Sequence, residues 1–281
     1  MQNVRPYNEC AQFAPVAPIQ ILEEMLKTDV KRLFGNYHLF LAHHTVAYPE
    51  RFNELIASFQ RKMQFSQLTI IMDNSIVELG GAVDDDMIAE AVNIIKPKDY
   101  YVTEVVPCLP DVMGDGAATT ALSAEAYDRW TMANNPMPGD GYMVVTQGKT
   151  WEDFTDLVNH FFVEKAEYYR NIQWVGIPRK LQSPLGSRAR AIQYIQMVAP
   201  HVKIHLLGFS EHIADDLFCA RVPGVRGIDS AVPVRYPHQL NPMTSDEEIG
   251  PRGDWWDVGK LETQAKYNIE NVRQWLLVKG R

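Results

Sequence analysis

Short apolar segments alternate with amphipathic segments along most of the chain, and this alternation constrains the fold more than any other feature. Residues 68–72 form a nearly continuous apolar run, which is typical of a strand buried on both faces of a parallel sheet. Residues 84–96 instead have apolar side chains at helical spacing and acidic side chains in the first turn. The pattern predicts a repeating strand–helix unit.

Seven strands are predicted at residues 38–46, 68–72, 100–106, 142–146, 172–175, 204–207 and 225–228, with a short, degenerate first strand at 14–19. Helices are predicted at residues 19–34, 49–62, 84–96, 117–132, 151–169, 188–198 and 213–220. Repeats of this number and length favour an α/β fold of the (β/α)8 TIM barrel class, with a doubly wound open sheet as the alternative.

One domain is expected over residues 1–281, with a long rim loop at 235–260 and a closing helix at 261–279. A loop of this length exceeds what a connector needs. Within it, Trp255 and Trp256 suit either a cover for the barrel or a platform on which bases stack.

Charge and cysteine content narrow the class of protein. The formal net charge of −8 gives no global basic field, so any contact with nucleic acid would need a local patch. Cys10, Cys108 and Cys219 are far apart, which argues against a disulfide framework or a structural zinc site. The chain has no signal-peptide pattern and no run of about 18 apolar residues, so we expect a cytoplasmic protein without a membrane span.

Polar residues and glycines follow the predicted strands at the end where a barrel places its chemistry. Asp73 and Asp229 lie after different strands, so two carboxylates would meet at one mouth, the minimum for a nucleophile and an acid/base partner. Glycines there would let a flat ligand approach the backbone. The further candidates are His43, His44, Asn74, Asp111, Gln147, Gly148, Gly176, Ile177 and Gly208.

Structural roles compete with these assignments. Residues 73–75 could form only an Asx turn, Gln147 could cap the following helix, and the adjacent His43 and His44 could be a structural pair. A metal site made of both histidines with Asp73 and Asp229 is disfavoured, because adjacent histidines project differently and no Glu/His set completes a coordination shell.

Four stretches resemble the tRNA-guanine transglycosylase superfamily. Residues 70–75 (Ile-Ile-Met-Asp-Asn-Ser) resemble the strand that ends in its catalytic Asp, and residues 144–148 resemble its Val-Gln-Gly segment. Residues 174–177 and 205–208 resemble its glycine-ended sixth and seventh strands. Gly-Ile-Asp-Ser-Ala-Val-Pro-Val-Arg at 227–235 resembles its nucleophile segment and is the most specific match.

The chain also departs from that family. The zinc module, a Cys-x-Cys-x-x-Cys with a distal His, is absent, and the chain is shorter than the tRNA enzymes. Asn-Ser-Ile at 74–76 replaces the Ser-Gly-Gly that follows the catalytic Asp. In these respects the chain resembles the short phage and bacterial enzymes that insert 7-deazaguanine bases into DNA.

The resemblance implies a reaction without metal or redox cofactor. Asp229 would attack C1′ of a guanine nucleotide, guanine would leave, and a covalent glycosyl–enzyme would form. Asp73 would take the proton of the incoming 7-deazaguanine, which requires a raised pKa. Asp111 would pair with the N1/N2 edge of guanine, and Gln147 and the Gly176 backbone would read O6.

The implied partners are DNA and a 7-deazaguanine base such as the 7-cyano form (preQ0), with no membrane partner and with a homodimer left open. If a phage encodes the chain, its location would be the host cytoplasm. A tRNA-specific transglycosylase, a metal-dependent barrel hydrolase and a non-catalytic nucleic-acid-binding subunit are the alternatives. Phosphate contacts are expected from Arg179, Lys180, Arg188, Arg190 and Arg235.

Overall fold

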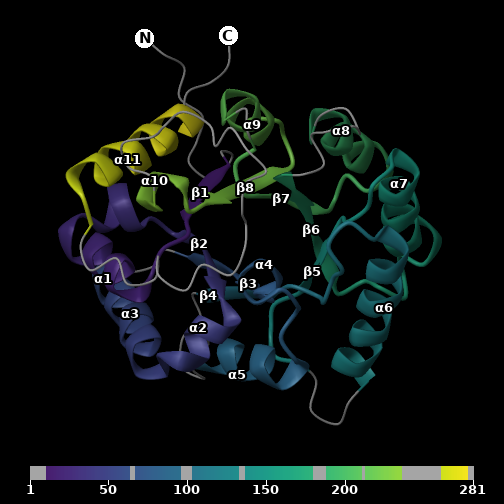
Figure 1. The fold of residues 1–281 in the computed structure, drawn as a ribbon, viewed down its shortest axis with the longest axis horizontal. Helices are drawn as coiled ribbons and strands as arrows, with labels where there is room; N and C mark the ends of the chain where they lie inside the picture. Colours follow the sequence, from purple (N-terminus) through teal and green to yellow (C-terminus); the bar gives the residue numbers. More distant parts are fainter. Residues whose placement is uncertain are drawn as a thin grey trace.

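The computed structural model describes residues 11–63, 67–95, 103–132, 137–179, 188–210, 213–235 and 261–277. These residues form a (β/α)8 barrel, in which a ring of parallel strands is surrounded by helices (Figure 1). The strands are Gln12–Pro15 (β1), Tyr37–Leu41 (β2), Leu68–Asp73 (β3), Thr103–Pro107 (β4), Tyr142–Val145 (β5), Ile172–Pro178 (β6), Lys203–Leu207 (β7) and Val225–Ser230 (β8). The predicted fold class is confirmed.

The helical segments follow the strands around the ring. They are Ile19–Thr28 (α1), Val30–Phe34 (η2), Ala42–Ala47 (α2), Pro49–Lys62 (α3), Ile76–Leu79 (α4), Asp85–Ile95 (α5), Gly116–Met132 (α6), Trp151–Asn159 (α7), His160–Glu164 (η3), Arg188–Val198 (α8), Ile213–Ala220 (α9), Val232–Arg235 (α10) and Thr263–Leu277 (α11). The segments η2 and η3 are single π-helical turns.

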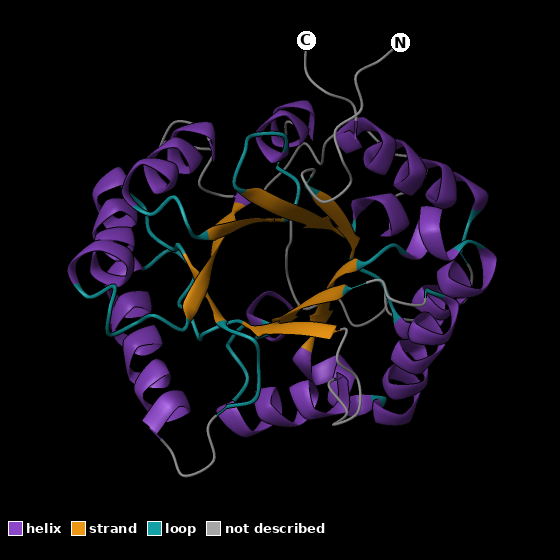
Figure 2. Cartoon of the chain, turned by 180° about the vertical axis from the view of Figure 1, so that it is seen from behind, coloured by secondary structure: helices purple, strands orange, loops and turns teal. Residues whose placement is uncertain are grey.

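Hydrogen-bonded ladders join the strands in two groups, β1-β8-β7-β6-β5 and β2-β3-β4. A bridge between Cys108, just after β4, and Met143 of β5 connects the groups on one side, where the Leu109 N–H donates to the Met143 carbonyl at 2.8 Å. On the other side β1 lies against β2 (Figure 2). The described strands therefore enclose one barrel rather than the open sheet considered as the alternative.

Side chains alternate between the inside and the outside of the barrel. On β6, Trp174 belongs to the apolar cluster that fills the barrel, whereas Val175 and Ile177 belong to the cluster between the strands and the helices. On β3 the inward position is Ile71, and on β2 the inward positions are Tyr37 and Leu39. This period of two fixes which residue at each strand end points into the barrel.

Three predicted elements need correction. The predicted strand at 38–46 ends at Leu41, because Ala42 begins α2 and the Thr45 hydroxyl donates to the Leu41 carbonyl at 3.0 Å, closing a helical turn. The predicted first strand at 14–19 lies at Gln12–Pro15 instead. The predicted helix at 151–169 ends as an α-helix at Asn159 and continues as the π-turn η3.

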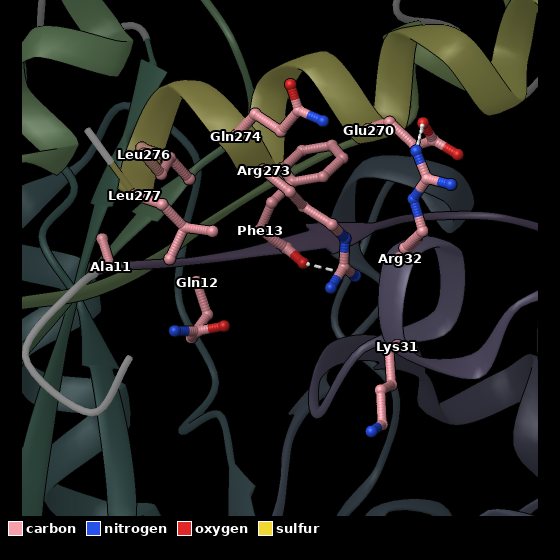
Figure 3. Close-up of a pocket in the computed structure, with 10 residues that line it drawn as sticks. All are labelled: Ala11, Gln12, Phe13, Lys31, Arg32, Glu270, Arg273, Gln274, Leu276 and Leu277. Atoms are coloured by element: carbon pink, nitrogen blue, oxygen red, sulfur yellow. Dashed lines mark hydrogen bonds and ion pairs between the residues drawn. The ribbon is translucent and has the colours of Figure 1, made fainter. Parts of the chain in front are cut away.

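The closing helix is present as α11, and the predicted rim loop lies outside the described residues, together with Trp255 and Trp256. Helix α11 packs on β1 and η2 at the amino-terminal end of the strands (Figure 3). There Arg273 donates to the carbonyls of Phe13 and Phe34, and Arg32 pairs with Glu270 at 2.8 Å. The small pocket in Figure 3 is therefore at the opposite end of the barrel from Asp229.

Cys108 and Cys219 are free, buried thiols, and Cys10 lies outside the described residues. None of the described helices is long and apolar enough to cross a membrane.

We predict that Gly227→Ala destabilises the barrel by about 1–3 kcal/mol, because a Cβ there would overlap the ring of Tyr37. Urea unfolding measures this change. Gly81→Ala is the matched control, because no atom lies within 4 Å of the added Cβ. Equal stability of the two variants would contradict the packing of Tyr37 on β8.

Candidate active site

The alternation of side chains aims two carboxylates into the carboxyl end of the barrel. Asp73, the last residue of β3, is two residues after the inward-facing Ile71, so its side chain lies on the same, inner face of the strand. Asp229 of β8 is two residues after Gly227, whose Cα faces the inward-pointing Tyr37. The Asp229 side chain therefore also lies on the inner face of its strand. The structure therefore places both predicted catalytic residues at the same mouth.

Asp229 is held by one of its two carboxylate oxygens. Its Oδ1 accepts hydrogen bonds from the Gly208 N–H and from His205 Nε2, both at 3.0 Å. His205 Nδ1 lies 2.8 Å from the Tyr37 hydroxyl, so both ring nitrogens of His205 are held by hydrogen bonds. Oδ2 has no hydrogen-bond partner among the described residues, and the residue is 8% exposed. One oxygen is thus fixed by two hydrogen bonds, and the other has none in the described part of the chain.

Asp111 is the centre of a second polar group. Its Oδ1 accepts from Asn74 Nδ2 at 2.7 Å, and its Oδ2 accepts from Gln147 Nε2 at 2.6 Å. Asn74 also donates to the Leu109 carbonyl at 3.1 Å, and Gln147 Oε1 accepts from the Gly114 N–H. The three predicted substrate-binding residues are therefore brought together from β3, β4 and β5, in fixed orientations.

A tight turn follows Asp73. Asp73 Oδ2 accepts from the Ser75 N–H at 2.9 Å, and Asn74 Oδ1 accepts from the Ile76 N–H, so the predicted Asx turn is present. Ser75 has φ 62°, the one positive φ of a non-glycine residue among those described. Left-handed backbone at such a residue is unfavourable by roughly 1 kcal/mol and is frequent at functional sites. The turn starts the short helix α4, which carries Glu78.

The site is acidic, and burial raises the pKa of its carboxyl groups. Asp73 has a pKa well above its usual value, because it is desolvated and because the charges of Glu78, Asp111 and Asp229 oppose its ionisation. Burial, with a contribution from Asp229, raises the pKa of Glu78 to about 7. Burial also raises the pKa of Asp111, against the effect of its two amide donors. Asp73 is therefore suited to hold a proton near neutral pH.

The predicted glycine positions have different environments. Gly208 has φ 68° and donates its N–H to Asp229 Oδ1, a contact that was not predicted, while its predicted role beside a flat ligand stays a prediction. Gly148 lies before α7 with the Asp153 side chain against its Cα. Gly176 faces Met143 inside the barrel, and its carbonyl already accepts two hydrogen bonds from Thr146. This carbonyl is thus part of the barrel wall.

Three predicted binding residues need correction. Strand β6 continues to Pro178, so Ile177 is inside the strand and packs outward against the helices rather than into the mouth. His43 and His44 lie on α2 instead of at the end of a strand, with ring centroids 5.5 Å apart. Burial lowers the pKa of His43, and burial together with His43 lowers that of His44 to about 4, so both rings are neutral at pH 7.

The predicted phosphate contacts divide into three groups. The prediction that Arg188 contacts phosphate is wrong, because this side chain is fully buried and pairs with Asp216 at 2.9 Å. Arg190 is exposed, with its guanidinium 3.9 Å from the centroid of Trp151. Arg179 lies beside Gly208, and Arg235 ends α10. Lys180 lies outside the described residues.

Arg188 has a structural function. It donates to the carbonyls of Ile177 and Leu207, at the carboxyl ends of β6 and β7, while Asp216 also binds Ser210. The pair thus fixes the strand end that precedes Gly208, the donor to Asp229. Sequence reasoning missed this role because the spacing of Arg188 on a helix does not reveal its burial.

Three further residues of the site were not predicted: Tyr37, Glu78 and His205. His205 lies in the segment 205–208 of β7 and follows Ile204, which packs against the helices, so strand alternation was the available signal that His205 points into the barrel. Glu78 gave no sequence signal, because the turn at Ser75 that returns the chain toward Asp73 is unusual for serine.

No protein-family model and no curated protein sequence matches the chain. Solved structures do resemble it. A fructose-1,6-biphosphate aldolase candidate from Coccidioides immitis has a TM-score of 0.52 at 11% identity, over 96% of this chain and 92% of that one. D-Psicose 3-epimerase with D-tagatose from Clostridium cellulolyticum H10 has a TM-score of 0.50 at 13% identity, over 99% of this chain and 100% of that one. At such identities these similarities establish the barrel fold alone.

We predict that Arg188→Met lowers the free energy of unfolding by about 3–5 kcal/mol, because it leaves Asp216 buried without its cation. Arg190→Met, on the same helix, is the control and is expected to change it by no more than about 1 kcal/mol. Chemical unfolding of both variants measures the difference. If Arg190→Met were the more damaging change, the assignment of the buried pair would be wrong.

We also predict a pH-dependent effect of Glu78→Gln on stability. Glu78 ionises near its usual 4.5 in the unfolded chain and near 7 in the fold, so the fold binds the extra proton between these values and loses this stabilisation as the pH rises. Relative to the wild type, the variant should therefore gain stability from pH 5 to pH 8. Chemical unfolding at each pH measures the difference in unfolding free energy between the variant and the wild type, and Glu90→Gln at an exposed position is the control. A constant difference between variant and wild type would contradict the raised pKa.

Proposed function

We propose that this chain is a guanine transglycosylase that exchanges guanine in DNA for a 7-deazaguanine derivative through a covalent intermediate on Asp229. The observation that carries the proposal is the asymmetry of Asp229. Its Oδ1 is fixed by His205 and Gly208, while Oδ2 has no partner in the described structure. The neighbouring Asp73 has a raised pKa. These are the features that a nucleophile and its proton-transfer partner need.

In the first step Asp229 Oδ2 attacks C1′ of the guanine nucleotide, and the bond from C1′ to N9 breaks. The hydrogen bonds to Oδ1 hold the carboxylate plane in one orientation, which favours a single direction of attack. They also stabilise the carboxylate anion when it returns as the leaving group in the second step. The departing guanine takes a proton from Asp73.

In the second step the 7-deazaguanine base gives its N9 proton to Asp73, and N9 attacks C1′ while the bond from C1′ to Oδ2 breaks. The proton that Asp73 gave to guanine is thereby returned. The enzyme is regenerated without a redox change, and the two displacements keep the configuration at C1′.

Asp111 is the candidate for recognition of the guanine edge. Its two oxygens are oriented by Asn74 and Gln147, and each carboxylate oxygen can accept more than one hydrogen bond. The adjacent N1–H and N2–H donors of guanine suit such a carboxylate. Exposed apolar side chains on α4 (Val77 and Leu79) and in the loop after β4 (Val112 and Met113) offer a surface for a base extruded from the duplex.

The choice of DNA rests on the sequence resemblance to the short branch that lacks the zinc module. Arg179, Arg190 and Arg235 remain the candidates for phosphate contacts among the described residues. The acidic mouth and the net charge of −8 disfavour tight non-specific binding to DNA.

We predict that the protein releases labelled guanine from DNA when 7-cyano-7-deazaguanine is added, with the same rate in the presence of a chelator. Asp229→Asn and Asp73→Asn should each lower the rate by at least about 10³-fold, because each removes a group that acts in the bond-breaking steps. The exposed Asp86→Asn on α5 is the matched control and should retain the wild-type rate.

Other outcomes would decide between the alternatives. Release of guanine from tRNA alone would assign the chain to the tRNA-specific reaction. Loss of activity with the chelator would support a metal-dependent hydrolase. Tight DNA binding without exchange in the wild type would indicate an accessory subunit and overturn the proposal.

A further inference from the structure

The hydroxyl of Tyr37 crosses the barrel to the ring that holds Asp229. It lies 2.8 Å from His205 Nδ1, and His205 Nε2 lies 3.0 Å from Asp229 Oδ1. The three residues come from β2, β7 and β8, and all three are buried. In such a chain of hydrogen bonds the position of each proton matters, because a buried donor without an acceptor is costly.

The proton of the Tyr37 hydroxyl has one acceptor. The hydroxyl and the His205 ring have no hydrogen-bond partners among the described residues beyond the two contacts just given. Burial and the charges of Asp229 and Glu104 raise the pKa of Tyr37 well above its usual value, so the phenol keeps its proton. The acceptor that the described structure offers to this proton is Nδ1 of His205.

Other proton arrangements leave a buried donor unsatisfied. A proton on Nδ1, in the other neutral form of the ring or in the imidazolium, would face the Tyr37 oxygen and leave the phenol proton without an acceptor in the described part of the chain. The other neutral form would also turn the lone pair of Nε2 toward Oδ1 of Asp229, an oxygen that already accepts the Gly208 N–H.

We propose that Tyr37 is a positioning residue for the nucleophile: it donates to Nδ1 of His205, keeps the single ring proton on Nε2, and thereby secures a donor for Oδ1 of Asp229. This inference rests on the proposed function, which makes Asp229 the nucleophile. Tyr37 lies on the strand opposite this carboxylate and acts on it through His205.

The donor on Nε2 serves both displacements without gaining or losing a proton. When Oδ2 of Asp229 bonds to C1′, Oδ1 becomes the carbonyl oxygen of the ester and still accepts from Nε2 and from the Gly208 N–H. When the incoming base attacks C1′, the bond from C1′ to Oδ2 breaks and its electron pair returns to the carboxylate. The same two donors then stabilise the anion.

Two substitutions at position 205 separate the donor from the ring. The amide nitrogen of Gln can take the place of Nε2 and always carries protons, so His205→Gln keeps a donor for Asp229 without help from Tyr37. The shorter amide of Asn corresponds to Nδ1, so His205→Asn leaves Oδ1 with the Gly208 N–H alone. We expect guanine release by His205→Gln to be at least about tenfold faster than by His205→Asn, the difference that one hydrogen bond makes. Equal rates would overturn the inference.

Tyr37→Phe keeps the ring and removes the hydroxyl. In the wild-type background we expect single-turnover guanine release to fall at least about tenfold, while the Kd for the DNA changes by no more than about twofold, because the reacting carboxylate is affected and the DNA contacts are not. In the His205→Gln background the same change should alter the rate by no more than about twofold. Tyr127→Phe, which removes a hydroxyl on α6 that donates to the Tyr168 carbonyl, is the control and should keep the wild-type rate. An unchanged rate in Tyr37→Phe, or equal losses in both backgrounds, would overturn the inference.

Nitrogen-15 NMR of the histidine-labelled protein tests the proton position without any reaction. The signal that is missing from His205→Gln identifies His205 among the 8 histidines of the chain. We expect a protonated Nε2 and an unprotonated, hydrogen-bonded Nδ1 in the wild type, with Nδ1 shifting to the position of an unbonded nitrogen in Tyr37→Phe. A proton on Nδ1 in the wild type would overturn the inference, even if Tyr37→Phe failed to fold.

Together the measurements distinguish failure of this inference from failure of the proposed function. If Nε2 carries the proton and the wild type exchanges no base, the proton arrangement stands and the transglycosylase assignment fails. If base is exchanged while Nδ1 carries the proton, or while Tyr37→Phe slows both backgrounds equally, the transglycosylase stands and the role of Tyr37 fails.

Discussion

The hydrogen bonds from His205 and Gly208 to Oδ1 of Asp229 link this carboxylate, the proposed nucleophile, to the barrel wall. They join β7 to β8 at the mouth, and Tyr37 extends the link across the barrel to β2. Tyr37 in turn needs the bare Cα of Gly227, where any side chain would collide with its ring. The orientation of one carboxylate therefore depends on contacts among three strands, two of them distant from β2 in sequence.

The acidity of the mouth is the second constraint. Asp111 and Asp229 each accept hydrogen bonds from two donors, whereas Asp73 accepts one from the Ser75 N–H and Glu78 Oε2 has no donor in the described part of the chain. Burial raises the pKa of Asp73, Glu78 and Asp111, and the two amide donors of Asp111 oppose its shift. The buried Arg188 supports the Gly208 donor from outside the barrel, because it fixes the strand end beside Gly208.

The sequence predicted the barrel and the placement of Asp73, Asn74, Asp111, Gln147 and Asp229, because strand periodicity and strand ends are local properties. It did not predict features that depend on distant contacts. The burial of Arg188, the outward side chain of Ile177 and the helical His43 and His44 follow from tertiary packing. Glu78 enters the site through the left-handed turn at Ser75, a conformation that serine rarely adopts and that composition does not signal.

The most direct test of the account is to trap the covalent intermediate. The protein would be incubated with a guanine-containing DNA oligonucleotide without the incoming base, then denatured, digested and analysed by mass spectrometry. The account predicts an adduct equal to the oligonucleotide minus guanine on the peptide that contains Asp229, and no adduct for Asp229→Asn. An adduct on Asp73, or release of guanine without any adduct, would contradict the assignment of Asp229 as the nucleophile.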